Sequence, residues 1–275
     1  MKKRLRSIGV LLTVAMLLSG CGGNEQTESP VLEQGQSDLQ YVQEKGTLVV
    51  GITDYAPMDY QQDEGWTGFD VDLAKAFADS LGVTLQFTEI DWNQKTELLE
   101  KGSIDCIWNG MTMTEELQET ISCSDPYLSN AQVVVLKRTV AEKYQTVEAC
   151  QHMLFAVEAG STAEALLKEM KYRYTAYPTQ KEALQSVLDK KADAAVIDII
   201  MAAYYTGDGQ DFEDLAFSFS VNDEKICVGF RKDSDLTEQA NEFLQAAYEN
   251  GVIRSLAEQY GIMGAVLNDA DATSR

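Results

Sequence analysis

The chain has 275 residues, of which 45% are hydrophobic and 24% are charged, and this composition suits one or two globular domains with a buried core. It carries 44 acidic residues against 22 basic ones, a formal net charge of −22. Such an acidic surface repels nucleic acid and anionic lipid headgroups, so neither is an expected partner.

The first twenty residues have the pattern of an export signal. A basic start precedes an apolar run at 8–18, and Ser19 and Gly20 lie directly before Cys21. The run is too short to span a bilayer as a mature helix, so residues 1–20 are predicted to be a secretory signal peptide. The small residues before a cysteine resemble the bacterial lipoprotein signal, which implies lipidation of Cys21, with palmitate among the expected lipids. An ordinary signal peptide followed by a stray cysteine is the alternative.

The polar stretch 21–37 is typical of a flexible tether. Because no later stretch is long and apolar enough to cross a bilayer, attachment is expected through the lipid alone. We therefore expect the protein at the extracytoplasmic face of the cell membrane.

The remaining cysteines, Cys106, Cys123, Cys150 and Cys227, form no CxxC pair and no metal-ligand spacing. Cys106 and Cys227 lie in apolar runs and are expected to be buried, while a disulfide among the four is left open. The single histidine, His152, has no nearby acid or cysteine cluster. Neither a metal nor a cofactor is expected.

Strands and helices alternate along the chain, which predicts a parallel sheet with helices on both faces. Glycines follow the last periodic residue of several helices, as helix ends favour. The predicted order is helix 38–46, strand 47–52, helix 68–82, strand 83–90, helix 92–102 and strand 104–108, then strand and loop 152–160, helices 161–170 and 181–191, and strand 193–198.

Two segments of this series resemble each other, "LLEKGSIDCIWN" and "VLDKKADAAVID". Each is a helix end, a short basic turn, an aspartate and a buried strand that runs into a polar residue. We interpret them as equivalent parts of two lobes with the same architecture. Extended runs at 124–138 and 225–233 then predict a two-stranded hinge, and the final helices at 236–251 and 252–261 return to the first lobe.

A cluster of small polar residues follows the strand at 104–108. We interpret "CIWNGMTMTEELQET" as a strand end, a polar turn and a helix start. The turn offers Asn109, Gly110, Thr112 and Thr114. Ligands of open α/β sheets bind at the carboxyl ends of strands, so this turn is a candidate binding site.

Seven segments in this order resemble the family 3 extracellular solute-binding proteins, the amino-acid receptors of ABC importers: "LVVGITDYAPMDY", "GFDVDLAKAFADSLGV", "GSIDCIWNGMTMT", "SDPY", "VEAGSTAEALL", "ADAAVID" and "NGVIRSLAEQYG". The likeness covers about residues 38–262. It implies an α/β fold of the type II periplasmic-binding-protein kind, with two lobes, each a mostly parallel sheet flanked by helices, and a two-strand hinge. The expected bounds are 38–131 for the first part of lobe 1, 132–222 for lobe 2, 223–265 for the return to lobe 1, and 266–275 for a tail.

The resemblance also implies a set of ligand-binding residues. Two aromatic rings cover the ligand, a turn and a helix N-terminus bind its carboxylate, and an acid binds its α-amino group. Physical chemistry agrees, since helix N-termini attract anions and aspartate pairs with ammonium groups. The matching positions are Tyr55 and Trp92 for the rings, Asn109, Gly110 and Thr112 for the turn, Ser161 and Thr162 for the second-lobe loop, Asp198 for the acid, and Glu158 for a further side-chain contact.

Several of these residues have a simpler interpretation. Tyr55 and Trp92 could be surface packing, and the Ser161 hydroxyl could be used entirely by a capping box with Glu164. Trp108 is expected in the core instead of the cleft. Thr114 is expected to cap a helix instead of contacting ligand.

One residue departs from the family pattern. The family has an arginine that binds the ligand carboxylate three residues after the threonine matching Thr114, and this chain has Leu117 there. A charge-assisted hydrogen bond of that kind contributes roughly 1.5–3 kcal/mol. Three explanations stay open: an amino acid bound without that anchor, a substitute lysine such as Lys95, or a cationic amine that has no carboxylate.

The favoured function is a monomeric, lipid-anchored receptor, not an enzyme, that captures a small solute and passes it to ABC permease subunits. An amino acid is the first choice of ligand, and a cationic or carboxylate-poor solute is the alternative. A dehydratase that uses Glu158 or Asp198 as a general acid in the closed cleft is a less favoured hypothesis. A ligand sensor on the same fold is another.

Overall fold

The computed structural model describes residues 35–63 and 65–267 of the chain. The predicted signal peptide, Cys21 and most of the tether lie outside the described residues, as do residues 268–275 of the predicted tail. Within the described ranges, no helix combines the length and hydropathy that a membrane-spanning segment requires.

The first sheet has a parallel half and an antiparallel half. Strand β1 pairs in parallel with β4 and β5, while β13 runs antiparallel to β5, β6 and β7. The order is β4-β1-β5-β13-β6, with β7 also on β13. The strands are β1 (Thr47–Ile52), β4 (Thr84–Glu89), β5 (Cys106–Thr112), β6 (Ser122–Cys123), β7 (Leu128–Asn130) and β13 (Glu224–Phe230).

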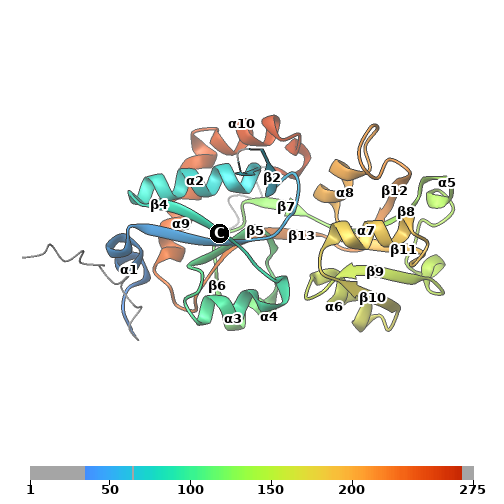
Figure 1. Cartoon of the computed structure of the whole chain (residues 1–275), viewed down its shortest axis with the longest axis horizontal. Coiled ribbons are helices and arrows are strands. Elements are labelled where there is room, and N and C mark those ends of the chain that lie inside the picture. The colour runs from blue at the N-terminus through green and yellow to red at the C-terminus, as the bar shows by residue number, and fades with distance from the viewer. Residues whose placement is uncertain (1–34, 64, 268–275) are drawn as a thin grey trace, which may run out of the picture.

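Helices cover both faces of this sheet because successive side chains of a strand point to opposite faces (Figure 1). In β5, Cys106 and Trp108 pack in the cluster that includes residues of α2 (Phe69–Leu81), α9 (Leu236–Glu249) and α10 (Val252–Gln259). Ile107 and Met111 pack on the other side with Leu99 of α3 (Lys95–Glu100). Trp108 is fully buried, which confirms its prediction as a core residue.

The second sheet follows the same plan. Its order is β10-β9-β11-β8-β12, with β9, β10 and β11 parallel and β8 antiparallel to both of its neighbours. Residues of α6 (Thr162–Glu169) and α7 (Gln180–Leu188) pack in two different clusters with alternate residues of these strands. The strands are β8 (Gln132–Lys137), β9 (Leu154–Glu158), β10 (Arg173–Tyr177), β11 (Ala194–Asp198) and β12 (Leu215–Ser220).

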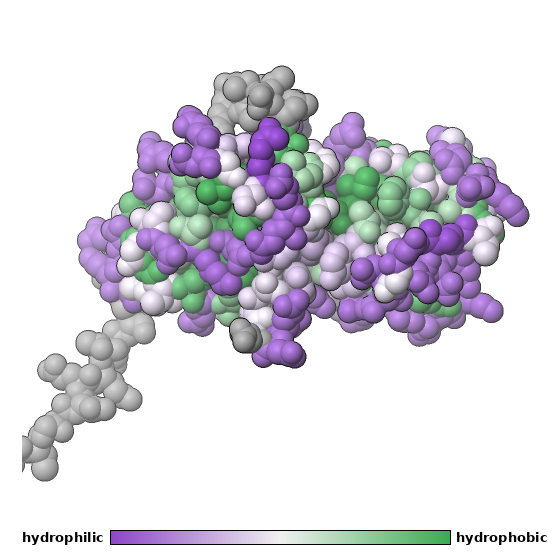
Figure 2. Space-filling view, turned by 90° about the horizontal axis from the view of Figure 1, so that it is seen from above, coloured by the Kyte–Doolittle hydropathy of each residue, from purple (hydrophilic) through white to green (hydrophobic). Residues whose placement is uncertain are grey.

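The chain passes between the two sheets twice, from β7 to β8 and from β12 to β13. Only Ala131 separates β7 from β8, so this connection is an almost continuous strand. Figure 1 shows the resulting two lobes side by side, and polar residues cover much of the face in Figure 2. The predicted fold class, two α/β lobes joined by two strands, is confirmed. The sheets are mixed instead of mostly parallel, because β13 and β8, the strands next to the crossings, run antiparallel to their neighbours.

Shorter elements complete the lobes. Helix α1 ends at Gly46, whose φ of 70° is the left-handed conformation that glycine adopts readily. The remaining elements are α1 (Asp38–Lys45), β2 (Tyr60–Gln62), β3 (Gly65–Thr67), η1 (Trp92–Gln94), α4 (Glu115–Thr120), α5 (Arg138–Ala141), η2 (Glu148–Cys150), α8 (Ile199–Tyr205) and η3 (Met263–Ala265).

Two predicted elements differ from the structure. The strand predicted at 104–108 starts at Cys106 and continues to Thr112, so the predicted polar turn is in fact the end of β5. The strand continues because Met111 and Thr112 pair with β13, which comes from the far end of the sequence. The helix predicted at 92–102 is divided into the 3₁₀ turn η1 and α3.

Candidate functional site

A cavity of about 470 Å³ lies between the lobes, which is within the usual size range of small-molecule sites. Its walls come from the loop after β1, the end of β5 and η1 in the first lobe, and from the ends of β9 and β11 and the start of α6 in the second. The structure brings all nine sequence-predicted site residues to this cavity: Tyr55, Trp92, Asn109, Gly110, Thr112, Glu158, Ser161, Thr162 and Asp198. Their contact with a ligand stays a prediction.

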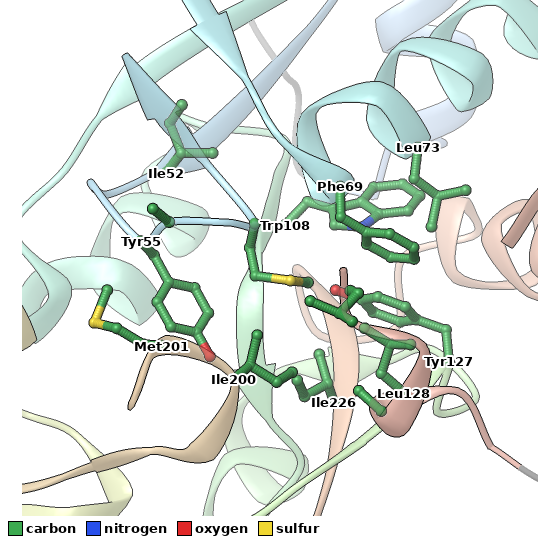
Figure 3. Packing of buried hydrophobic residues seen from close by; sticks show 14 of the residues in the cluster. Ile52, Tyr55, Phe69, Leu73, Trp108, Tyr127, Leu128, Ile200, Met201 and Ile226 are labelled. Atoms are coloured by element: carbon green, nitrogen blue, oxygen red, sulfur yellow. The ribbon is translucent and has the colours of Figure 1, made fainter. Parts of the chain in front are cut away.

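Tyr55 belongs to the first lobe and packs against the second. Its ring lies beside Met201 and Ile200 of α8, within the hydrophobic cluster that spans both lobes (Figure 3). The Tyr55 hydroxyl is buried and has no hydrogen-bond partner among the described residues, and burial raises its pKa well above the ordinary value. A buried hydroxyl of this kind is a polar group that a bound ligand can satisfy.

The Asn109 side chain holds the Tyr55 loop in place. Its Oδ1 accepts hydrogen bonds from the Thr53 N–H at 2.7 Å and the Thr53 hydroxyl at 2.8 Å, and its Nδ2 donates to Asp59 Oδ2 at 2.8 Å. The Gly110 N–H donates to Asp70 Oδ2 at 2.7 Å. These polar groups of Asn109 and Gly110 therefore already have protein partners, and they position the wall of the cavity.

Asp198 is the last residue of strand β11, and three side-chain amides donate hydrogen bonds to its carboxylate. Its carboxylate accepts from Gln132 Nε2 at 2.9 Å and from the amides of Asn130 and Gln180, while its own N–H donates to Gln180 Oε1 at 3.0 Å. Burial, and then the charge of Glu224, raises the pKa of Asp198 to about 7. The amides fix the carboxylate at the cavity wall and favour its charged form.

Glu224 links this network to the first lobe. Its Oε2 accepts from the Thr112 hydroxyl at 2.7 Å and from the amides of Asn130 and Gln132, both at 3.0 Å. Because the Thr112 hydroxyl donates to Glu224, it does not supply a donor for a ligand carboxylate in this arrangement. Asn130, Gln132 and Glu224 lie at the strand crossings, so the network joins the cavity floor to the hinge.

Glu158 is the second acid that lines the cavity. It ends strand β9 and is only 6% exposed. Burial, followed by the charge of Asp198, raises the pKa of Glu158 to about 8. The charge of Asp198 thus raises the pKa of Glu158, and two buried carboxyl groups in one cavity favour a positively charged guest, because a cation stabilises their ionised forms.

The start of α6 is capped as the sequence predicts. The Ser161 Oγ accepts from the Glu164 N–H at 3.2 Å, and its hydroxyl donates to the Glu158 carbonyl at 2.7 Å. The Glu164 carboxylate reaches back to the Gly160 N–H at 2.7 Å. The Ser161 hydroxyl is thus fully used, and its N–H approaches the Glu158 carbonyl at 3.3 Å. This leaves the N–H groups of Thr162 and Ala163, in the first turn, without an intrahelical acceptor.

Thr114 caps α4, which confirms its predicted role, since its Oγ1 accepts from the Leu117 N–H at 3.1 Å. Leu117 itself is half-buried and lines the cavity, so no basic group enters from this position. Cys106 and Cys227 are buried as predicted.

Sequence reasoning missed the amides that surround Asp198. Gln132 directly precedes the apolar run of β8, and Gln180 is the first residue of α7. The available signal was a polar residue beside a buried apolar segment, as in "NAQVVV" and "NDEKICV". That signal is weak, because the same pattern occurs at any exposed strand end.

Two α/β lobes with a cavity between them, lined by both polar and apolar side chains, define a two-lobed ligand-binding protein. The sequence model of one protein family, the bacterial extracellular solute-binding proteins, family 3, matches residues 48–263 of the chain. The chain belongs to this family.

Similar proteins include both binding proteins and an enzyme. The chain is 28% identical over 223 residues to the arginine-binding extracellular protein ArtP of Bacillus subtilis, a match covering 78% of this chain and 86% of ArtP. It is 29% identical over 180 residues to the cyclohexadienyl dehydratase of Pseudomonas aeruginosa, covering 63% of this chain and 67% of that enzyme.

A solved structure has the same architecture. The ABC uptake transporter substrate-binding protein of Streptococcus pneumoniae, crystallised with bound histidine, superposes with a TM-score of 0.76. The two are 28% identical, and the match covers 83% of this chain and 97% of that one.

Proposed function

We propose that the protein is a lipid-anchored extracytoplasmic receptor that binds an amino acid in the interlobe cavity and delivers it to an ABC importer. The observation that carries this proposal is the convergence of residues from both lobes, Tyr55 and Thr112 from one and Thr162 and Asp198 from the other, on a single cavity. A ligand that contacts both walls stabilises the closed arrangement.

We assign residues 38–131 and 223–265 to lobe 1 and residues 132–222 to lobe 2. The two lobes move relative to each other about the strand crossings. Relatives that bind arginine or histidine support an amino acid as the ligand. The buried acids Glu158 and Asp198 would pair with its ammonium group, and Tyr55 and Trp92 would cover it. Cys21 would carry the lipid, and permease subunits would receive the solute.

The test is a thermal-shift and calorimetric screen of amino acids, amines and small peptides with the chain that starts at Cys21. The expected result is stabilisation by at least one amino acid, and about a tenfold or greater loss of its affinity in Asp198→Asn, since a charge-assisted contact is worth more than 1.4 kcal/mol. Failure of every solute to stabilise the protein contradicts the proposal. Release of Cys21→Ser from membranes tests the anchor.

A second candidate is an enzyme that uses the same cavity. Glu158, whose pKa of about 8 keeps it protonated near neutral pH, has the property of a general acid, and one relative is a dehydratase. Incubation of the purified protein with a prephenate-like acid distinguishes the candidates. Turnover that is lost in Glu158→Gln supports the enzyme, and binding without turnover supports the receptor.

A further inference from the structure

Lys95 is a buried lysine with an unusual set of partners. It starts α3 and is 8% exposed, and its Nζ donates to the Trp92 carbonyl at 3.2 Å and to the Gly160 carbonyl at 3.1 Å. The ammonium also lies 4.6 Å from the centre of the Trp92 ring. Gly160 belongs to the second lobe, so the Lys95 head group lies where the two lobes meet.

The Lys95 ammonium forms no direct ion pair among the described residues. No acidic oxygen lies within salt-bridge distance of its Nζ in the part of the chain that the structure describes. An ammonium group has three donors, and two neutral carbonyls account for two of them. The acids Glu158, Asp91 and Glu116 act on Lys95 from farther away and compensate its burial only in part, so the site is suited to an anionic guest that can contact the ammonium directly.

Lys95 is also the one basic side chain among the described residues that line the cavity. The other charged lining residues are acids: Asp54, Glu116, Glu158 and Asp198. Among the described lining residues, Lys95 is thus the side chain of opposite charge that a negatively charged group of a ligand can contact.

A second group of donors lies at the same place. Gly160, which accepts from Lys95, is two residues before Thr162, the first residue of α6, and Thr162 also lines the cavity. The N–H groups of a first helical turn have no intrahelical acceptor and carry a partial positive charge. The ammonium from lobe 1 and these N–H groups from lobe 2 can therefore share one anion.

We infer that Lys95 binds the carboxylate of the ligand, in place of a basic side chain at position 117, and that the ligand class is α-amino acids and not amines. This inference rests on the proposed receptor function. The ligand would lie with its carboxylate between Lys95 and the start of α6, and with its ammonium group toward Asp198.

The experiment compares each amino acid with the amine that lacks its carboxylate: arginine with agmatine, histidine with histamine, and lysine with cadaverine. Dissociation constants are measured by calorimetry for the wild type, Lys95→Met, Lys95→Arg and the control Lys101→Met. Lys101 follows the same helix, but its side chain is exposed and paired with Glu97. Circular dichroism and melting curves check that each variant folds.

The wild type should bind the preferred amino acid about 10- to 100-fold more tightly than its amine, since a charge-assisted bond is worth roughly 1.5–3 kcal/mol. Lys95→Met should reduce this ratio to near one, whereas Lys95→Arg and Lys101→Met should keep it. The double variant Lys95→Met with Leu117→Arg should restore the preference for the amino acid. This double variant also provides the test if Lys95→Met alone folds poorly.

Two results would overturn the inference, and a third would overturn the receptor function on which it rests. If Lys95→Met lowered the affinity for the amino acid and for its amine equally, Lys95 would only hold the two lobes together through its hydrogen bond to the Gly160 carbonyl. A wild type that binds both partners of a pair equally would make amines the ligand class. Failure of the wild type to bind any solute would instead contradict the receptor function itself.

Discussion

Gly110 lies directly against the ring of Tyr55. A Cβ atom at Gly110 would lie 2.2 Å from Tyr55 Cε1, and its φ of 55° is a conformation that residues with a side chain rarely adopt. Because Gly110 has no side chain, the Tyr55 ring can pack directly against strand β5 and form the aromatic wall of the cavity.

Replacing Gly110 by alanine should displace the Tyr55 ring into the cavity and lower ligand affinity. Gly82→Ala is the matched control, because Gly82 has a φ of 72° and nothing within 4 Å of its would-be Cβ. Gly82→Ala should lower the free energy of unfolding only by the cost of placing alanine in a left-handed backbone conformation, about 1–2 kcal/mol. Melting curves and calorimetry on both variants measure the two effects. Unchanged affinity in Gly110→Ala would show that Tyr55 does not contact the ligand.

The ligand-free protein should lose stability as the pH rises from about 5 to about 8. Burial raises the pKa of Asp198 to about 7 and of Glu158 to about 8, so the folded state holds protons that the unfolded state releases at lower pH. The unfolding free energy therefore falls through this window, because the native state binds more protons. Urea denaturation at several pH values measures the slope.

The control for this slope is the exposed acid Glu116, which also lines the cavity. Glu158→Gln should reduce the slope without abolishing it, because burial also raises the pKa of Asp198 and of Asp70 to about 7, while Glu116→Gln should leave the slope unchanged. A slope that is the same in all three proteins would assign the effect to the overall acidic charge of the chain.

Binding of a carboxylate should weaken when Lys95 loses its proton. Burial lowers the pKa of Lys95 to about 8, although the nearby charges of Glu158, Asp91 and Glu116 oppose this shift. The preference for an amino acid over its amine should accordingly fall between about pH 7 and pH 9. Lys95→Arg should keep the preference across this range, since guanidinium stays charged. A preference that does not change with pH in the wild type would contradict this prediction.

Thr114→Ala should destabilise the protein by about 1 kcal/mol, the usual cost of losing an N-cap. It should leave ligand affinity unchanged, because its Oγ1 is occupied by the Leu117 N–H. Thr114→Ser should restore the stability. Chemical denaturation and calorimetry measure the two properties, and a clear loss of affinity in Thr114→Ala would make Thr114 a ligand contact.

The candidate site could be predicted only in part from the sequence. Thr162 and Asp198 lie at the ends of elements with a clear local pattern, Tyr55 follows such an element, and all three line the cavity. The partners that these groups bind could not be predicted, because Gln132 and Glu224 approach Asp198 and Thr112 through hydrogen bonds between distant parts of the chain.

The sequence by itself determined the order of strands and helices, the helix ends at Gly46 and Gly82, the caps at Thr114 and Ser161, and the two-lobed class of fold. These features depend on hydrophobic periodicity and on groups a few residues apart, so local chemistry specifies them. Only the tertiary structure decided that β5 extends through Asn109 and Gly110. It also decided that the Thr112 hydroxyl faces Glu224 and that Lys95 reaches the second lobe. Those outcomes depend on strand pairing and lobe contacts between segments far apart in the sequence, which no local pattern encodes.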